Sequence, residues 1–469
     1  MSPKIGLIFL LISLFSAFSN HLLASENTLS PSPIPDTSFT KRTFKEWSKS
    51  GEFEFHWRTF FMSTLNKGEL LDYSALGTGA GLGYSSPHFK GFQVVFSGFF
   101  VFQLHEHNIT IADPITDGVN RYELTLFDMN DLENRTDLDR LEELFFRYER
   151  KGFVFTFGRQ KFSSPLLNMQ DNRMRPNIFS GIHANYKWNN WEFLAAGFHA
   201  MTIRGTLDWY SVEESLGVYP FGRSPFGVSS DYKGNIRSKG IGVLGIKQKG
   251  QKVKSELWNY TAENIFNLSF AQSEYRDSLF GLQWTIGAQC FYQMPLNFGG
   301  NEDPLQAFIV PGQQTFGLGG KIETKLGKHT VSLNNLHISD RGRFLFPREW
   351  GREIFFASLP RERFEGNGGV NAYTLKYSLN LPRHDWVLNF GASTVYVPDM
   401  NNVMLNKYGM PAYHHLILGV DHGLAGFFDG LHLRFLAVNK IAQNRNIPDI
   451  YRINRVDMWQ FNFVVDYLF

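Results

Sequence analysis

The residues of this 469-residue chain that could do chemistry are mostly charged, and they gather in a few segments between apolar runs. One such segment, residues 161–177, carries four charged side chains, namely Lys161, Asp171, Arg173 and Arg175. Pro165 and Pro176 limit the backbone freedom of this segment. Charges held in a confined space act through a reduced dielectric, so a few of them could decide which ions enter that space. The segment is therefore a candidate for selecting ions.

The same charged residues also admit purely structural roles. Each arginine could pair with a nearby carboxylate and stiffen a wall, and Asp171 could anchor its segment to a strand. A second cluster, residues 340–369, combines arginines and glutamates, namely Arg341, Arg343, Arg348, Arg352, Arg361 and Arg363 with Glu349, Glu353, Glu362 and Glu365. It either packs a loop through mutual salt bridges, is held by anionic lipid headgroups, or gathers anions at a mouth. Residues 128–143 lean acidic, so the sign of a preferred solute stays open.

Signatures of catalysis, nucleotide binding and metal binding are absent from the sequence. No G-x-S-x-G, H-E-x-x-H, P-loop or dinucleotide-binding pattern occurs in a suitable context. His105 and His107 share a face, and His414 adjoins His415, but no carboxylates or thiols cluster with them. Satisfied or solvated histidines are the simpler interpretation. We therefore expect no enzyme, no metal site and no cofactor.

The composition favours a protein made of strands. Aromatic residues make up 16% of the chain, with 46 Phe, and Gly is also frequent at 43, whereas charged residues are only 19%. Lys and Arg number 46 against 44 for Asp and Glu, so a net charge of +2 provides no field to attract nucleic acid. This balance and a single cysteine, Cys290, exclude a disordered chain, a coiled coil and a disulfide scaffold.

Long runs of alternating apolar and polar residues predict where the strands lie. In residues 279–293, Trp284 and Ile286 fall on one face and Gln283 on the other, and residues 459–469 end the chain in the same way. A β-sandwich also alternates, but runs of about ten residues with aromatic ends are typical of a transmembrane barrel. In a barrel the polar faces point inward, and they include three arginines, Arg58, Arg147 and Arg434.

The order of short and long connections predicts the number of strands. Export barrels have tight turns at the periplasmic end and long loops outside. Candidate turns lie at residues 85–91, 150–152, 188–190, 249–251, 276–278, 327–328, 381–385 and 423–430. Longer connections lie near 65–73, 105–139, 161–177, 201–237, 260–263, 294–313, 340–369, 398–411 and 441–455. These eight turns and nine loops alternate, which predicts an all-β antiparallel barrel of 18 strands with both termini periplasmic and a water-filled interior.

The prediction of one of these strands depends partly on the direction in which its neighbours must run. Residues 264–275 alternate only modestly, through Phe266, Leu268 and Phe270, and their outer connection is short. Without a strand here, two neighbouring segments would run in the wrong direction, so we expect one.

The first residues predict export. Lys4 precedes an apolar run from Ile5 to Phe18, and small residues follow at Ala24 and Ser25, as in a secretory signal peptide over residues 1–25. The run is too short to span a bilayer comfortably as an anchor. Residues 26–50, with three prolines, predict a flexible periplasmic extension before a barrel over residues 51–469.

Several short motifs, taken in their order along the chain, resemble one known family. They are Asp72–Ala75, Gly79–Tyr84, Phe89–Phe92, Gly158–Gln160, Ser164–Pro165, Asn168, Asp171, Arg173–Met174, Pro176–Asn177, Phe179–Gly181, Arg348–Glu353, Pro360–Arg363, Glu365–Gly366 and Val465–Tyr467 with the terminal Phe469. The chain resembles the OprD-type outer-membrane porins, the substrate-specific channels of Gram-negative bacteria. The resemblance spans most of residues 50–469.

The resemblance implies an 18-stranded barrel whose third outer loop folds inward and narrows the pore. That loop corresponds here to residues 161–177, where Arg173 and Arg175 would form the basic side of the constriction and Asp171 the acidic side, with Lys161 nearby. Arg58, Arg147 and Arg434 would extend a basic ladder along the wall. The implied function is passive uptake of small charged or polar nutrients, such as amino acids or carboxylates.

Two other functions stay open at this point. A non-specific general porin would differ only in lacking a solute-binding site, and an outer-membrane enzyme would need a nucleophile and base at the barrel rim. A receptor with a folded plug is excluded, because the residues before the barrel are too few for a domain. The expected partners are outer-membrane lipids and small solutes, without nucleic acid, and the expected location is the outer membrane of a Gram-negative bacterium. The protein would act as a monomer or a homotrimer.

Overall fold

A computed structural model of the protein describes residues 51–220, 222–279 and 281–469. The predicted signal peptide (1–25) and the predicted extension (26–50) lie outside the described residues. Among the described residues, no helix has the length and hydropathy that crossing a bilayer requires.

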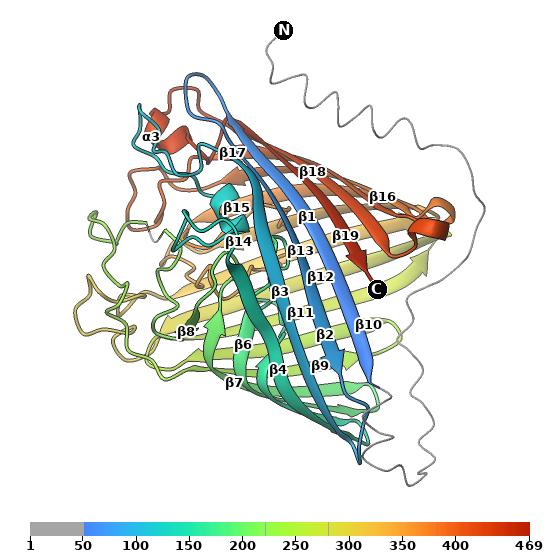
Figure 1. Ribbon diagram of the computed structural model, residues 1–469. Helices are drawn as coiled ribbons and strands as arrows, with labels where there is room; N and C mark the ends of the chain where they lie inside the picture. The colour runs from blue at the N-terminus through green and yellow to red at the C-terminus, as the bar shows by residue number, and fades with distance from the viewer. Residues whose placement is uncertain (1–50, 221, 280) are drawn as a thin grey trace.

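One closed antiparallel sheet dominates the described chain (Figure 1). Each long strand pairs with its neighbours in sequence, and β1 pairs with β19 over eleven positions, from His56 opposite Leu468 to Asn66 opposite Met458, which closes the barrel. The strands are β1 (Glu52–Asn66), β2 (Tyr73–Ser85), β3 (Phe92–His107), β4 (Leu138–Arg150), β5 (Phe153–Gln160), β6 (Ile178–Trp188), β7 (Trp191–Thr202), β8 (Trp209–Ser211), β9 (Ile241–Lys249), β10 (Val253–Ala262), β11 (Phe266–Leu279), β12 (Leu282–Pro295), β13 (Thr315–Leu326), β14 (His329–Ile338), β15 (Val370–Leu381), β16 (Trp386–Tyr396), β17 (Tyr413–Gly423), β18 (Leu431–Ala442) and β19 (Met458–Leu468).

The predicted count of 18 barrel strands is confirmed. The nineteenth strand, β8, has three residues, pairs only with β7 and lies in the long connection between β7 and β9. The strand whose prediction depended on the direction of its neighbours exists as β11, which pairs with β10 on one side and β12 on the other. Short helical turns complete the fold, namely η2 (Glu123–Leu126), η3 (Pro382–His384), η4 (Gly426–Phe428) and α3 (Asp449–Arg452).

The connections separate the two ends of the barrel, as Figure 1 shows: long loops gather at one end and short turns at the other. At the turn between β4 and β5, Lys151 and Gly152 both have positive φ angles, of 49° and 80°. Two consecutive positive φ angles match the tight hairpin turn whose twist suits antiparallel strands. Such turns leave no chain to fold into the barrel, whereas the long loops at the other end can do so.

The outer face of the barrel is apolar around its circumference. Along β19, Trp459 is 48% exposed while its neighbour Gln460 is fully buried, so the apolar residues of this strand point outward. Exposed apolar side chains recur on the other strands, for example Phe96, Phe146, Phe157, Ile182, Leu244, Leu257, Ile286, Leu318, Leu333, Tyr373 and Phe390. An apolar outer surface on a closed antiparallel barrel suits contact with the hydrocarbon of a bilayer. Cys290 is exposed on this face, where the alternation predicts it.

The interior is not wholly water-filled, which corrects the expectation from strand number. On β10 and β11 the inward residues include Trp258, Tyr260 and Phe270, all buried in a large apolar cluster. Phe266, Leu268 and Phe270, whose alternation predicted β11, belong to this cluster and so point inward. The period of two reveals a strand but does not tell which face contacts lipid when both faces carry apolar residues.

Two loops complete the apolar cluster from inside the barrel. Loop 161–177 contributes Phe162, Leu166 and Leu167, and loop 339–369 contributes Phe344, Phe346, Trp350 and Phe355. Aromatic contacts join the loops to the wall: the ring centroids of Phe291 and Phe344 lie 4.7 Å apart, and those of Phe266 and Trp350 lie 6.0 Å apart. The two loops therefore rest mainly on β6 to β12, which supply most of the aromatic wall residues of the cluster. The cluster continues onto β14–β17 through Leu336, Ile338, Val370, Ala372, Val395 and Tyr413.

Candidate functional site

Two cavities lie inside the barrel, and we name them by the nearer end. The turn-side cavity, of about 490 Å³, is lined by inward residues of β1 and β13–β19 and by residues 171–172 and 358–361. The loop-side cavity, of about 150 Å³, is lined mainly by residues of the long loops, among them Arg121, Arg173, Arg204, Arg352 and Arg455. Asn172 and Arg361 line both cavities. These two residues, one from each inward loop, therefore mark the place where the cavities meet.

The tip of loop 161–177 is tied to the strands that close the barrel. Asp171 forms an ion pair with Arg58 of β1, with 2.5 Å between Oδ1 and Nη1. Arg58 also donates to the carbonyl oxygen of Arg173 at 2.7 Å and pairs with Asp466 of β19, where Nε and Oδ1 are 2.6 Å apart. Arg58 is 4% exposed. The loop leaves the wall at β5 and β6 and is held at β1 and β19, so it crosses the interior.

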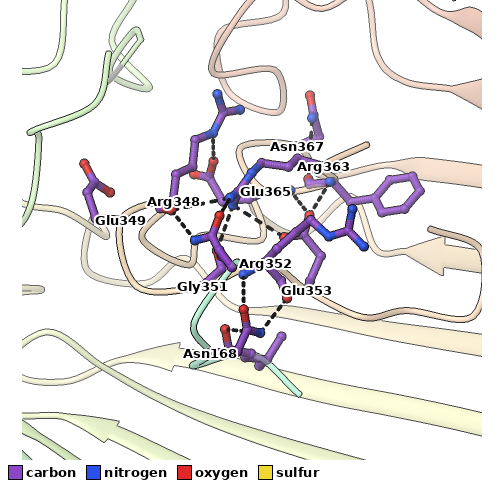
Figure 2. Close-up of polar contacts among 12 residues, drawn as sticks. Asn168, Arg348, Glu349, Gly351, Arg352, Glu353, Arg363, Glu365 and Asn367 are labelled. Atoms are coloured by element: carbon purple, nitrogen blue, oxygen red, sulfur yellow. Dashed lines mark hydrogen bonds and ion pairs between the residues drawn. The ribbon is translucent and has the colours of Figure 1, made fainter. Parts of the chain in front are cut away.

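Loop 339–369 contacts the same segment through Asn168 (Figure 2). Asn168 donates from Nδ2 to the carbonyl oxygen of Arg352 at 2.9 Å. Gln170 donates to the carbonyl oxygen of Arg348 at 2.7 Å. Gly351 admits this close approach, because a Cβ at its position would lie 1.8 Å from the carbonyl oxygen of Leu166. The two loops thus form one inward-facing unit.

Two of the three roles considered for residues 340–369 fit loop 339–369, namely packing by salt bridges and supplying cations to a cavity. Arg348 pairs with Glu365, with 2.6 Å between Nε and Oε2, and Arg363 lies 3.9 Å from Glu353 (Figure 2). These ion pairs pack the loop. Four of its arginines, Arg348, Arg352, Arg361 and Arg363, also line the loop-side cavity. The loop is therefore internally paired and at the same time contributes cations to the passage.

The four residues predicted for the constriction lie in three different surroundings. Asp171 lines the turn-side cavity and Arg173 lines the loop-side cavity. Arg175 is 1% exposed, donates to the carbonyl oxygen of Leu138 at 2.8 Å, and lines neither cavity. Lys161 pairs with Glu143 of β4 at 2.9 Å and also lines neither cavity.

The three wall arginines also differ. Arg58 and Arg434 both line the turn-side cavity, and both form ion pairs with Asp466. Arg147 lies over the ring of Phe145, with its guanidinium carbon 5.1 Å from the ring centroid, and lines neither cavity. Arg58 and Arg434 are thus already compensated by carboxylates.

Of the two residues at the meeting point, Asn172 was not singled out by the sequence analysis, and Arg361 was named there only as one member of the mixed cluster 340–369. Arg361 has a positive φ of 65° and donates from Nη2 to Oδ1 of Asn462 on β19, at 2.5 Å. Lys440 of β18 donates to the carbonyl oxygen of Arg361 at 3.0 Å. Arg361 lies within the Pro360–Arg363 motif and within the arginine-rich cluster 340–369, and these were the two available signals. Nothing in the sequence pairs it with Asn172, because the two belong to different loops.

Burial and neighbouring cations lower the pKa values of the arginines near the meeting point of the two cavities. Burial, with Arg361 and Arg204 nearby, holds the pKa of Arg173 well below its usual range. Burial, with Arg204 and Arg352 nearby, lowers the pKa of Arg361 to about 9. Arg361 still carries its charge at neutral pH. The part of the chain that the structure describes holds no group of three or more His, Cys, Asp or Glu arranged to bind a metal ion.

Comparison with known proteins identifies the fold but returns no relative by sequence. No protein-family model matches the chain, and no curated protein matches it. Solved structures do match. OccK9 (OpdG) of Pseudomonas aeruginosa superposes with a TM-score of 0.69 at 12% identity, covering 90% of this chain and 99% of the other. This chain has the fold of the OprD-type porins.

Two further porin structures agree with this assignment. OccAB4 of Acinetobacter baumannii gives a TM-score of 0.69 at 12% identity, with 89% of this chain and 98% of the other covered. OpdK of Pseudomonas aeruginosa, solved with vanillate, gives 0.68 at 13% identity, with 90% and 99% covered. The resemblance stated from short motifs is therefore supported at the level of the porin fold over nearly the whole of each matched chain.

Proposed function

We propose that this protein is an outer-membrane channel through which small solutes diffuse passively. The observation that carries the proposal is the pair of cavities inside a closed barrel with an apolar outer face, which meet at Asn172 and Arg361. A solute would pass from the loop-side cavity to the turn-side cavity beside these two residues. The porin fold of the matched structures supports a channel rather than an enzyme.

The charge of the linings supports a preference for anions. The loop-side cavity is lined by eight arginines and one lysine, against one glutamate, Glu362. The turn-side cavity is nearly balanced, with Arg58, Arg361, Arg434 and Lys376 against Asp171, Glu323 and Asp421. Because fixed charges act strongly in a narrow, poorly hydrated space, the loop-side lining would admit anions more readily than cations. Small carboxylates and other anionic nutrients are the solutes that this lining favours.

Within this channel we assign the constriction to Asp171, Asn172, Arg173 and Arg361. Loop 161–177 would narrow the pore, held there by the Asp171–Arg58 ion pair. Arg58 and Arg434 would line the passage beyond it. Lys161, Arg147 and Arg175 would act on the pore through the position of the loop and wall rather than by touching the solute.

The same proposal sets the orientation in the membrane. Export barrels have short turns at the periplasmic end and long loops outside. The loop-side cavity would then face the medium, and both chain ends would be periplasmic. Residues 1–25 would direct export and be removed, and residues 26–50 would precede the barrel in the periplasm. The location would be the outer membrane of a Gram-negative bacterium, as a monomer or a homotrimer.

Planar-bilayer recording tests the function. Purified protein in a bilayer with a tenfold KCl gradient should give stepwise conductance and a reversal potential on the side of chloride preference. A carboxylate solute should reduce the single-channel current if the lining binds it, whereas a general porin would show no solute-induced block. Protein that folds and inserts but never conducts would contradict the proposal.

A further inference from the structure

Six of the ten arginines that line the two cavities have no carboxylate partner among the described residues. Arg58, Arg348, Arg363 and Arg434 each lie within 4.0 Å of a carboxylate. No carboxylate of the described residues lies within that distance of the other six, which all line the loop-side cavity, namely Arg121, Arg173, Arg204, Arg352, Arg361 and Arg455. Four of these six act on one another's charge, and we call Arg173, Arg204, Arg352 and Arg361 the arginine cluster.

The hydrogen bonds of the arginine cluster go to neutral groups. Arg173 donates to the hydroxyl of Thr125 and to the carbonyl oxygen of Asn172, and Arg204 donates to the amide oxygen of Asn172 and to the hydroxyl of Tyr219. Arg361 donates to the amide oxygen of Asn462. For the guanidinium of Arg352, the described part of the chain offers neither a hydrogen bond nor an ion pair. The positive charge of the cluster is therefore held in place but not neutralised.

The members of the cluster are close enough to affect one another. Burial and the charge of Arg204 lower the pKa of Arg352 against the opposing charges of Glu353 and Glu362, and burial with Arg204 and Arg352 lowers the pKa of Arg361. The acid in the lining of the loop-side cavity, Glu362, is engaged elsewhere, since its Oε1 accepts from Tyr413 at 2.8 Å and lies 3.1 Å from Nδ1 of His415. Four cations that repel one another around one cavity form a site for an anion.

We propose that Arg173, Arg204, Arg352 and Arg361 bind the dianionic phosphate group of a small phosphate ester. This inference rests on the proposed channel function and names a class of solute for the same passage. A carboxylate has one negative charge and pairs with one guanidinium fork, which would leave the other arginines uncompensated. A phosphate monoester carries up to two charges and three terminal oxygens, so guanidinium groups from different directions can each donate to it.

The size and the other lining groups of the cavity fit a small ester. One water needs roughly 10–15 Å³ by this measure, so the loop-side cavity of about 150 Å³ holds about ten waters. Tyr122, Tyr219, Tyr408 and Tyr413 also line it, so their rings and hydroxyl oxygens surround the charged groups, while each hydroxyl proton is donated to a protein acceptor. A phosphorylated three-carbon or sugar-like compound matches this combination of charge and polar surface.

Two probes with one carbon skeleton test the proposal. Glycerol 3-phosphate and glycerate differ mainly in carrying a phosphate or a carboxylate, and each is added to single channels of the intact protein at pH 8. Glycerol 3-phosphate should block the current at about one-tenth of the glycerate concentration, because it carries a second charge to pair with the cluster. Equal block by the two probes, or equal block by the dicarboxylate malonate, would overturn the phosphate assignment.

A pair of variants distinguishes binding at the arginine cluster from the general effect of removing one positive charge. Arg352→Gln removes a guanidinium without a protein partner, so the fold should survive and the preference for glycerol 3-phosphate should fall roughly tenfold. The matched control Arg341→Gln changes an exposed arginine of the same loop that lines neither cavity, and should leave the preference unchanged. An unchanged preference in Arg352→Gln would sink the inference while leaving the channel function standing, and absence of conductance in the unmodified protein would contradict the function itself.

Discussion

The two sides of the barrel wall share an apolar outer face and differ in what they present to the interior. From β6 to β12 the inward residues are large and apolar, such as Phe198, Trp258, Tyr260 and Phe291, and the two inward loops pack on them. From β14 round to β1 the inward residues toward the turns include Ser332, Asn389, Asp421 and Arg434, and these line the turn-side cavity. We call the first side the filled sector and the second the open sector.

This difference explains where the two inward loops pack. Burying a large apolar side chain is favourable by about 1.5–3 kcal/mol, so Phe162, Leu167 and Trp350 of the loops settle on the filled sector. The open sector presents polar and charged residues such as Ser332, Asp421 and Arg434 among its apolar ones, and together they line the turn-side cavity. The filled sector thus acts as a scaffold for the loops, and the loop tips complete the passage along the open sector.

The largest effect should come from breaking the scaffold at Trp350. Trp350 is fully buried, its indole N–H donates to Ser215 Oγ at 2.8 Å, and its ring packs near Phe346. Trp350→Ala should cost about 3–5 kcal/mol of unfolding free energy and release loop 339–369, which would raise single-channel conductance severalfold. Thermal unfolding and conductance measure the two effects. The control Phe298→Ala, at an exposed loop position, should change neither, and unchanged conductance in Trp350→Ala would argue against the scaffold role.

The next effect should come from the tether at the open sector. Arg58→Gln leaves Asp171 without its ion-pair partner and should cost about 3 kcal/mol, since one member of a buried charge network is removed. The tip of loop 161–177 should then fluctuate, which would appear as open-channel noise. Asp171→Asn should produce the noise with a smaller loss of stability, because Arg58 keeps Asp466. Quiet channels in both variants would show that the tether does not hold the tip.

A smaller effect, on selectivity alone, should distinguish Arg361 from Arg175, which the sequence analysis placed in the constriction. Arg361→Gln removes a charge that lines both cavities and should reduce the anion-to-cation permeability ratio about two- to threefold, by weakening the local field. Arg175→Gln alters a buried arginine that lines neither cavity and should leave the ratio unchanged in the protein that folds. Reversal potentials in a salt gradient measure both. The opposite ranking would place the filter at Arg175.

The smallest effect should be a pH dependence at Glu362. Burial by itself would raise the pKa of this carboxyl, but His415, Lys440 and the hydroxyl of Tyr413 lower it below the ordinary value. The ionised Glu362 carboxylate therefore stabilises the folded protein fully above the pKa of about 4.3 that a glutamate has in the unfolded chain. This stabilisation is lost as the pH falls through the lower pKa that Glu362 has in the folded protein. Channel noise should rise below about pH 4 in the unmodified protein. Glu362→Gln should show that noise already at pH 7, whereas Glu302→Gln, at an exposed loop position, should behave like the unmodified protein.

Much of the architecture could be read from the sequence because it depends on local patterns. The alternation of turns and loops predicted every barrel strand, including β11, since strand direction must reverse at each connection. The outward apolar rows were also predictable where the opposite face was polar, as in residues 459–469. In β11 the apolar row of Phe266, Leu268 and Phe270 faces inward, and the pattern alone could not reveal this.

What only the tertiary structure decided is which charges meet across the barrel. Asp171 and Arg58 are 113 positions apart, and Arg361 and Asn462 are 101 positions apart, so no local periodicity connects them. Their meeting depends on how two loops settle on an apolar sector formed by several distant strands. The sequence by itself therefore determined the barrel and its lipid-facing surface, because strand period and chain reversal are local properties. The folded structure determined the passage and its charged lining, because these arise where loops from separate parts of the chain pack together.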